Sequence, residues 1–158
     1  MTARSLWATF RSTLPETAEP GIEPQGKAIA ELLEQRLGAR PGVEAVVVDL
    51  WRDAAYSIDA RVDGEPVYAI VSSFGEGSCE WLLCCTYDRG WIARLRESDA
   101  RVVAATRALA RHLHAILAAD PRFDQIRWYA EWDGSGVPRN GAPHPSGPGR
   151  AARARGDS

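Results

Sequence analysis

The stretch YSIDARVDGEPVYAIVSS, residues Tyr56–Ser73, decides the fold. Apolar and polar side chains alternate along Tyr56–Val62, which is typical of a β-strand with one covered face. The pair Asp63-Gly64 follows, and Asp-Gly is a strong hairpin signal because glycine accepts a positive φ without steric cost. Val67–Ser73 runs back after this turn. Residues 56–73 therefore predict an antiparallel hairpin.

Two further runs extend the hairpin into a four-stranded antiparallel meander. Val43–Trp51 precedes it and is rich in β-branched residues, with three consecutive valines that predict a strand covered on both faces. Cys79–Tyr87 follows it after a glycine-containing turn. The connections between these runs are short, which favours neighbouring antiparallel strands.

The residues around the meander predict two helices and a last strand. Gln25–Leu37 repeats its apolar residues at helical spacing, and a longer amphipathic helix begins at the cap residue Ser98 and ends before Pro121. Gln125–Trp132 follows as a strand. The order α-β-β-β-β-α-β predicts one α+β domain over residues 25–132, with both helices on one face of the sheet.

Two terminal segments lie outside this predicted domain. In residues 1–24, Leu6, Trp7, Phe10 and Leu14 have the spacing of one apolar stripe on a short helix, and three prolines follow. We expect an N-terminal arm and linker that folds back over the core or docks on a partner. Residues 133–158 hold six glycines, four prolines and four arginines, a composition that predicts a disordered tail.

Composition and charge restrict the class of protein. The formal net charge is −2, so the chain has no overall attraction to nucleic acid or to anionic lipid. Lys27 is the single lysine among nineteen basic residues, a bias typical of GC-rich bacterial genomes. The first residues lack the apolar run of a secretory signal, and no apolar run approaches the ~20 residues of a membrane helix. We predict a cytoplasmic protein with neither a membrane nor a nucleic-acid partner.

The cysteines and histidines do not form a catalytic or metal-binding pattern. Cys84 and Cys85 are adjacent and project to opposite faces of a strand, while Cys79 lies far along the same strand, so we expect buried structural thiols. His112 and His114 are about 200° apart around a helix, which prevents them from sharing one metal ion. The sequence also lacks a nucleophile motif or phosphate loop. We predict no catalytic residue, no metal and no cofactor, and a protein that is not an enzyme.

Tryptophan is the unusual feature of the composition. Six tryptophans in 158 residues exceed common usage, and tryptophan is enriched at binding hot spots. Several lie at or near the ends of predicted strands, where acidic residues also occur. An indole beside a carboxylate suits a sugar, a cationic ligand or a basic protein surface. The residues that we expect to form a partner-binding surface are Trp51, Asp53, Glu76, Glu80, Trp91, Trp128 and Trp132.

These observations predict a non-catalytic module that binds another protein, one with a basic surface, through a sheet face rich in tryptophan and carboxylates. Immunity proteins that neutralise toxins, and dedicated chaperones, share its size and charge. Two alternatives stay open. One is a small-molecule-binding protein or minor enzyme with a pocket between helix and sheet near His112. The other is a structural subunit of a larger complex that associates through a strand edge. No oligomeric state follows from the sequence.

Overall fold

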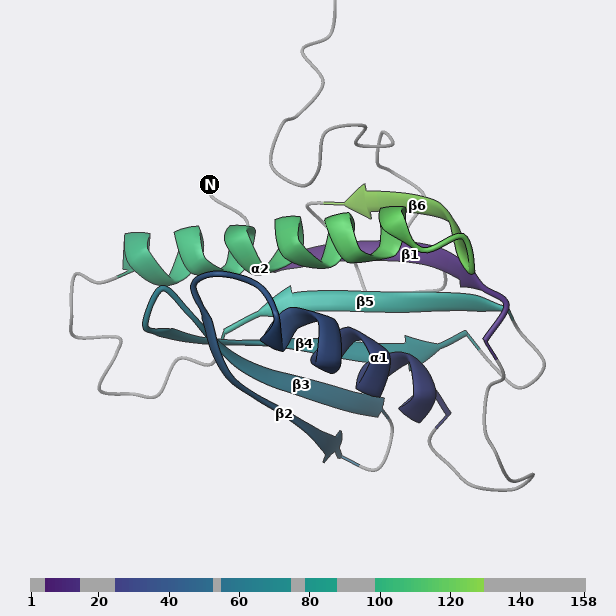
Figure 1. The fold of residues 1–158 in the computed structure, drawn as a ribbon, viewed down its shortest axis with the longest axis horizontal. Helices are drawn as coiled ribbons and strands as arrows, with labels where there is room; N and C mark the ends of the chain where they lie inside the picture. The colour runs from purple at the N-terminus through teal and green to yellow at the C-terminus, as the bar shows by residue number, and fades with distance from the viewer. Residues whose placement is uncertain (1–4, 15–24, 53–54, 75–78, 88–98, 130–158) are drawn as a thin grey trace, which may run out of the picture.

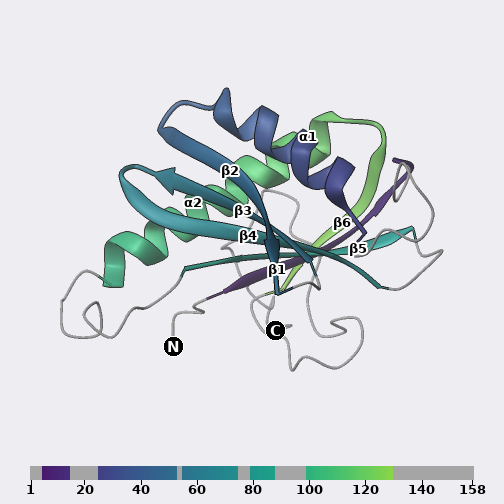
Figure 2. The same ribbon diagram turned by 90° about the horizontal axis from the view of Figure 1, so that it is seen from below.

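The computed structural model describes residues 5–14, 25–52, 55–74, 79–87 and 99–129. These residues form one six-stranded antiparallel sheet, in the order β2-β3-β4-β5-β1-β6, and two helices that pack against one face of it (Figures 1 and 2). The elements are β1 (Leu6–Ser12), α1 (Lys27–Gly38), β2 (Val43–Trp51), β3 (Ala55–Val62), β4 (Glu65–Ser73), β5 (Glu80–Thr86), α2 (Asp99–Ala119) and β6 (Phe123–Tyr129). The predicted α+β class and antiparallel meander are confirmed.

The hairpin of β3 and β4 forms as its turn sequence predicts. Asp63 and Gly64 both have positive φ, 51° and 84°, as a two-residue primed turn requires. Val62 and Glu65 pair directly on either side of the turn, which fixes the register of the whole hairpin. Because this register is fixed locally, Asp59 pairs with Tyr68 farther along the strands, and both side chains come to lie on the same face of the sheet.

The N-terminal segment differs from its predicted helix. Leu6–Ser12 is strand β1, which lies inside the sheet and pairs antiparallel with β5 on one side and β6 on the other. Leu6, Ala8 and Phe10 are buried, so the pattern of covered residues has a period of two. The prediction was wrong because the large apolar residues of this segment also fit a helical stripe. Hydrogen bonding to β5 on one side and β6 on the other stabilises the strand conformation, and such long-range pairing overrides local propensity.

The core lies between the helices and the face of the sheet that they cover. From α1 it includes Ile29, Leu33 and Leu37, and from α2 Leu109 and Leu113, all fully buried. Fully burying an aliphatic side chain of this size contributes about 1.5–3 kcal/mol. This face of the sheet therefore has little accessible surface for a ligand, and the candidate site must lie elsewhere.

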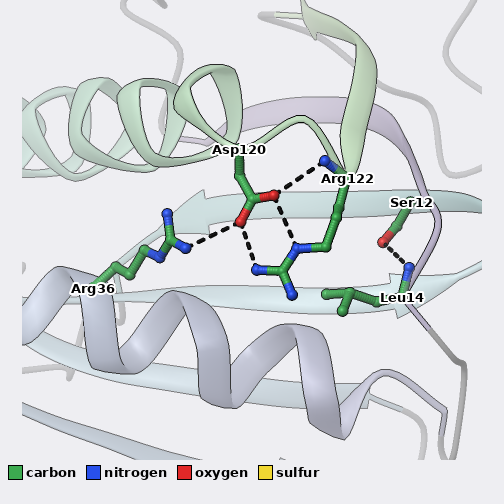
Figure 3. Close-up of polar contacts among 5 residues, drawn as sticks. All are labelled: Ser12, Leu14, Arg36, Asp120 and Arg122. Atoms are coloured by element: carbon green, nitrogen blue, oxygen red, sulfur yellow. Dashed lines mark hydrogen bonds and ion pairs between the residues drawn. The ribbon is translucent and has the colours of Figure 1, made fainter.

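A cluster of three charged residues joins the two helical regions to the start of β6 (Figure 3). The buried Asp120 carboxylate accepts hydrogen bonds from the Arg122 side chain, Nη2 to Oδ2 at 2.6 Å and Nε to Oδ1 at 2.9 Å. It also accepts a bond from the Arg122 backbone N–H at 3.0 Å and from Arg36 Nη2 of α1 at 3.1 Å. These bonds, those from the Arg122 side chain foremost, hold the pKa of Asp120 well below its usual range. Every carboxylate oxygen is satisfied within the fold, so this cluster is structural.

Nearby, β1 ends in a short side-chain cap that Figure 3 also shows. The Leu14 backbone N–H donates to Ser12 Oγ at 3.1 Å. Ser12 is the last residue of β1 and is itself buried. The contact satisfies a backbone donor where the strand ends, as serine side chains commonly do.

Candidate functional site

The face of the sheet opposite the helices carries the candidate site. Strand alternation and the pairing registers give one row of side chains across all six strands of this face. In sheet order, that row is Asp49, Ser57, Ile70, Cys84, Trp7 and Tyr129. We call this surface the helix-free face, because both described helices pack on the other side (Figure 2).

The helix-free face has two unlike halves. On β5, β1 and β6 most side chains are buried, as Leu82, Cys84, Thr9 and Tyr129 show, and Arg127 at the β6 edge is exposed. Thr9 Oγ1 and Tyr129 OH also lie 3.5 Å apart across the strands, within hydrogen-bonding distance. On β2, β3 and β4 the face is more open, and the charged residues of β3 are exposed there. We call this second part the exposed half of the face.

A hollow of about 540 Å³ lies on the exposed half. Strand pairing brings its principal side chains together: Asp59 of β3 pairs with Tyr68 of β4, and Arg61 lies two residues along β3. Trp51 closes the hollow at the end of β2. The residues that line it are Trp51, Ser57, Asp59, Ala60, Arg61, Pro66, Val67 and Tyr68. The hollow thus combines two aromatic rings with one carboxylate and one guanidinium.

Trp51 already holds one cation. The guanidinium carbon of Arg52 lies 4.8 Å from the centroid of the Trp51 ring, a cation–π contact. Arg52 adopts a left-handed backbone conformation, with φ of 51°, which ends β2 and turns its side chain back toward the indole. This contact places a positively charged group against the Trp51 ring.

The structure separates the residues predicted to form a partner surface. Trp51 lies at the hollow, while Glu80 is exposed at the start of β5, three strands away in the sheet. Trp128 was predicted wrongly to be on that surface: it is 4% exposed and packs on the helix side, where its indole N–H donates to His114 Nδ1 at 3.1 Å. The remaining four predicted residues, Asp53, Glu76, Trp91 and Trp132, lie outside the described residues.

Three side chains that give the hollow its chemistry, Asp59, Arg61 and Tyr68, were not among the residues predicted from the sequence. Asp59 and Arg61 belong to the polar side of the alternating strand, and Tyr68 lies on the returning strand of the same hairpin. The signal was present, because the Asp63-Gly64 turn fixes which residues of the two strands face each other. Counting back from the turn pairs Asp59 with Tyr68.

His112 does not line the hollow. It lies half-buried on α2, where burial and the nearby charges of Arg40 and Arg111 lower its pKa. The carboxylate of Asp63 has a smaller and opposite effect, because it raises the pKa of His112. The hollow and His112 lie on opposite faces of the sheet, so the two features do not form one site.

The cysteines separate into two kinds. Cys84 and Cys85 are buried as predicted, and burial raises the pKa of the Cys84 thiol to about 12. Cys79 is exposed, contrary to the prediction, because it lies just before β5 and outside the sheet. Arg11 Nη2 and Nε donate to its Sγ at 3.0 and 3.3 Å. Among the described residues, His, Cys, Asp and Glu nowhere gather in a group of three that could hold a metal ion.

Comparisons with known proteins add no assignment. The chain matches no protein-family model, no curated protein and no solved structure. Neither α1 nor α2 combines the length and the apolar composition that a membrane-crossing helix needs.

Proposed function

We propose that this protein is a non-catalytic module that binds another protein through the exposed half of the helix-free face. The observation that carries the proposal is the hollow, which is lined by Trp51 and Tyr68 together with Asp59 and Arg61. Aromatic and arginine side chains dominate binding energy at protein interfaces, and they do so most where a pocket receives an anchor from the partner. The toxin-neutralising and chaperone roles considered from the sequence both require a surface of this kind.

The chemistry of the hollow favours a basic anchor on the partner. Arg52 lies over the Trp51 ring in the free protein, and an arginine or lysine of the partner that displaces Arg52 can make the same kind of contact. Asp59, which is exposed, supplies a carboxylate within the same hollow. Arg61 lies beside it and restricts where a second positive charge can be placed. A single cationic side chain, flanked by uncharged residues, fits this arrangement.

Site-specific photo-crosslinking of the full chain in its own cells tests the proposal. The photoreactive residue replaces Arg61, which is exposed at the hollow, and in a matched control it replaces Gln35, which is exposed on α1. We expect one defined protein to be crosslinked from position 61 alone. Trp51→Ala should lower that crosslinking at least tenfold, since a hot-spot residue contributes about 2 kcal/mol or more. Equal crosslinking from both positions, or none from position 61, contradicts the proposal.

One second candidate is a small-molecule-binding protein, because the hollow places two aromatic rings and two oppositely charged side chains on one open surface. Native mass spectrometry of the protein purified from its own cells distinguishes the two functions. A bound compound that Trp51→Ala removes supports the small-molecule function.

A further inference from the structure

Strand β2 forms one edge of the sheet, and its outer side has a self-complementary pattern. We propose that two copies of the chain pair antiparallel through β2, so that the two six-stranded sheets become continuous. This pairing uses the edge of the sheet and does not depend on what occupies the hollow.

The exposed apolar residues of the described chain lie on this edge strand. Val47 is 57% exposed and Leu50 is 51% exposed, and they are the two large hydrophobic residues that the described part of the chain leaves open to solvent. Within the described residues β2 pairs with β3 alone, so its other side presents backbone groups that a further strand can bind. The Leu50 N–H donates to Asp49 Oδ1 at 2.7 Å, a local contact of the kind that satisfies donors at a sheet edge.

The helix-side row of β2 continues the hydrophobic core toward the edge. Val48 pairs with Ile58 and Leu50 pairs with Tyr56, and both partners are buried core residues. Val46 and Val48 are only partly buried and pack against the same core. The core therefore reaches the edge strand without being closed there by a polar residue, and apolar surface from a second copy can complete it.

A twofold axis through Val48 gives this row a matching partner. Antiparallel pairing about such an axis places Val48 beside Val48 of the partner subunit, and Val46 beside Leu50 of the partner subunit, twice. Val47 then lies beside Asp49 of the partner subunit. An axis through Asp49 would instead bring two carboxylates face to face, which is unfavourable. The axis at Val48 thus covers Leu50 without opposing like charges.

The two ends of β2 carry opposite charges. Glu44 is exposed near the start of the strand, and Arg52 is exposed directly after its end. Antiparallel self-pairing brings the start of each strand to the end of the other, so Glu44 approaches Arg52 of the partner subunit at both ends of the joint. The register of β2 with β3 shifts between Glu44 and Val47, so the regular ladder about the Val48 axis is made by Val47, Val48 and Asp49 of each copy. Val46, Leu50 and the two charged residues lie at its margins.

Sedimentation equilibrium of the full chain over a wide concentration range tests the pairing. We expect a mass that approaches twice the chain mass of 17.3 kDa as concentration rises. Leu50→Lys should keep the mass at one chain throughout, because a charge at an edge strand opposes pairing. Asp124→Lys is the matched control, since it adds a lysine to an exposed position of β6, and it should leave the dimer intact. Circular dichroism melting curves confirm that each variant is folded.

A charge exchange tests the orientation of the two strands. Glu44→Arg and Arg52→Glu should each weaken the dimer by about tenfold, because each change turns two exposed attractive pairs into repulsive ones. The double variant restores opposite charges at both ends and should recover most of the lost affinity. The pairing is overturned by a wild-type mass of one chain at every concentration, by an unaltered dimer in Leu50→Lys, or by a double variant as weak as the single ones. The crosslinking from position 61 is read separately, so failure of one proposal is distinct from failure of the other.

Discussion

The two edges of the sheet, β2 and β6, present opposite surfaces to a further strand. On β6 the exposed residues are polar or charged, Asp124, Gln125 and Arg127, while Trp128 and Tyr129 are buried. On β2 the exposed residues include the apolar Val47 and Leu50 together with Asp49. Proteins protect sheet edges with charges and with bulges that interrupt the regular ladder. The exposed residues of β6 are all polar or charged, whereas the middle of the β2 edge exposes two large apolar side chains on either side of the single charge of Asp49.

Both edge strands contain a register shift, and the position of that shift determines how much of the edge can pair with a further strand. In β6, Gln125 has φ of 52°, and the register with β1 shifts between Thr9 and Arg11, so the interruption divides the strand. In β2 the shift falls between Glu44 and Val47, which leaves Val47–Trp51 as a regular ladder. A bulge at the end of an edge strand therefore leaves a segment that can pair, whereas a bulge in its middle removes one.

The largest predicted loss of stability comes from a substitution that detaches β6 from the sheet. Phe10→Ala in β1 should destabilise the protein by about 3–5 kcal/mol, because it empties a fully buried ring site and removes the edge-to-face contact with Phe123, whose ring centroid lies 5.6 Å away. Chemical unfolding measures the loss. Hydrogen exchange should show β6 losing protection before β2, since β1 is the strand partner of β6 in the described sheet. Equal loss at both edges would contradict this account.

A smaller effect is expected at the cluster that anchors the start of β6. Asp120→Asn should cost about 2 kcal/mol, since charge-assisted hydrogen bonds from Arg122 and Arg36 are lost from a buried carboxylate. The pKa of Asp120 is lower in the folded chain than its ordinary value of 3.8, so its stabilising contribution is present above that value and is lost as the pH falls below it.

Urea unfolding measured between about pH 5 and pH 2 tests whether the contribution of Asp120 to stability is lost as the pH falls. The free energy of unfolding of the wild-type protein should fall more steeply with decreasing pH than that of Asp120→Asn. Parallel curves for the two proteins would show that the cluster does not contribute to acid sensitivity. No such cluster joins β2 to α1 among the described ion pairs, so the β2 edge should respond less to acid.

The smallest predicted effect on stability is at β2, and it tests whether this edge is open to solvent. Val47→Lys should change the free energy of unfolding by less than about 0.5 kcal/mol, because the side chain is more than half exposed. Thermal melting at low protein concentration, where association does not contribute, measures this change. A loss of several kcal/mol would mean that Val47 is a core residue and that the β2 edge is not open.

Local signals determined how much of the fold could be predicted. The Asp63-Gly64 turn and the alternation beside it placed β3 and β4 correctly, since a two-residue turn fixes both pairing and register. β1 could not be predicted in this way, because its partners lie far away in sequence and no turn connects it to them. Three consecutive valines predicted that β2 was covered on both faces, yet Val47 is 57% exposed on the helix-free face, and β2 is an edge of the described sheet.

The candidate site was also predicted only in part, because strand register decides which residues share a face of the sheet. Trp51 was identified because it ends a clear strand, but Trp128 was assigned to the same surface although it faces α2. Which face a strand residue occupies depends on register, and a shift of one residue reverses it. Asp59 and Tyr68 meet only through the hairpin register, so residue type alone could not have shown that they share a hollow.

The position of β1 between β5 and β6 has a consequence for synthesis of the chain on the ribosome. Thr9 of β1 and Tyr129 of β6 are separated by 120 positions, and Ser5 meets Thr86, Oγ to Oγ1 at 2.9 Å, across 81 positions. The earliest strand to emerge must wait for its neighbours, and closing such long loops slows folding. We therefore expect the meander to form during translation while β1 is still unpaired. The sheet is completed only after β6 has left the exit tunnel.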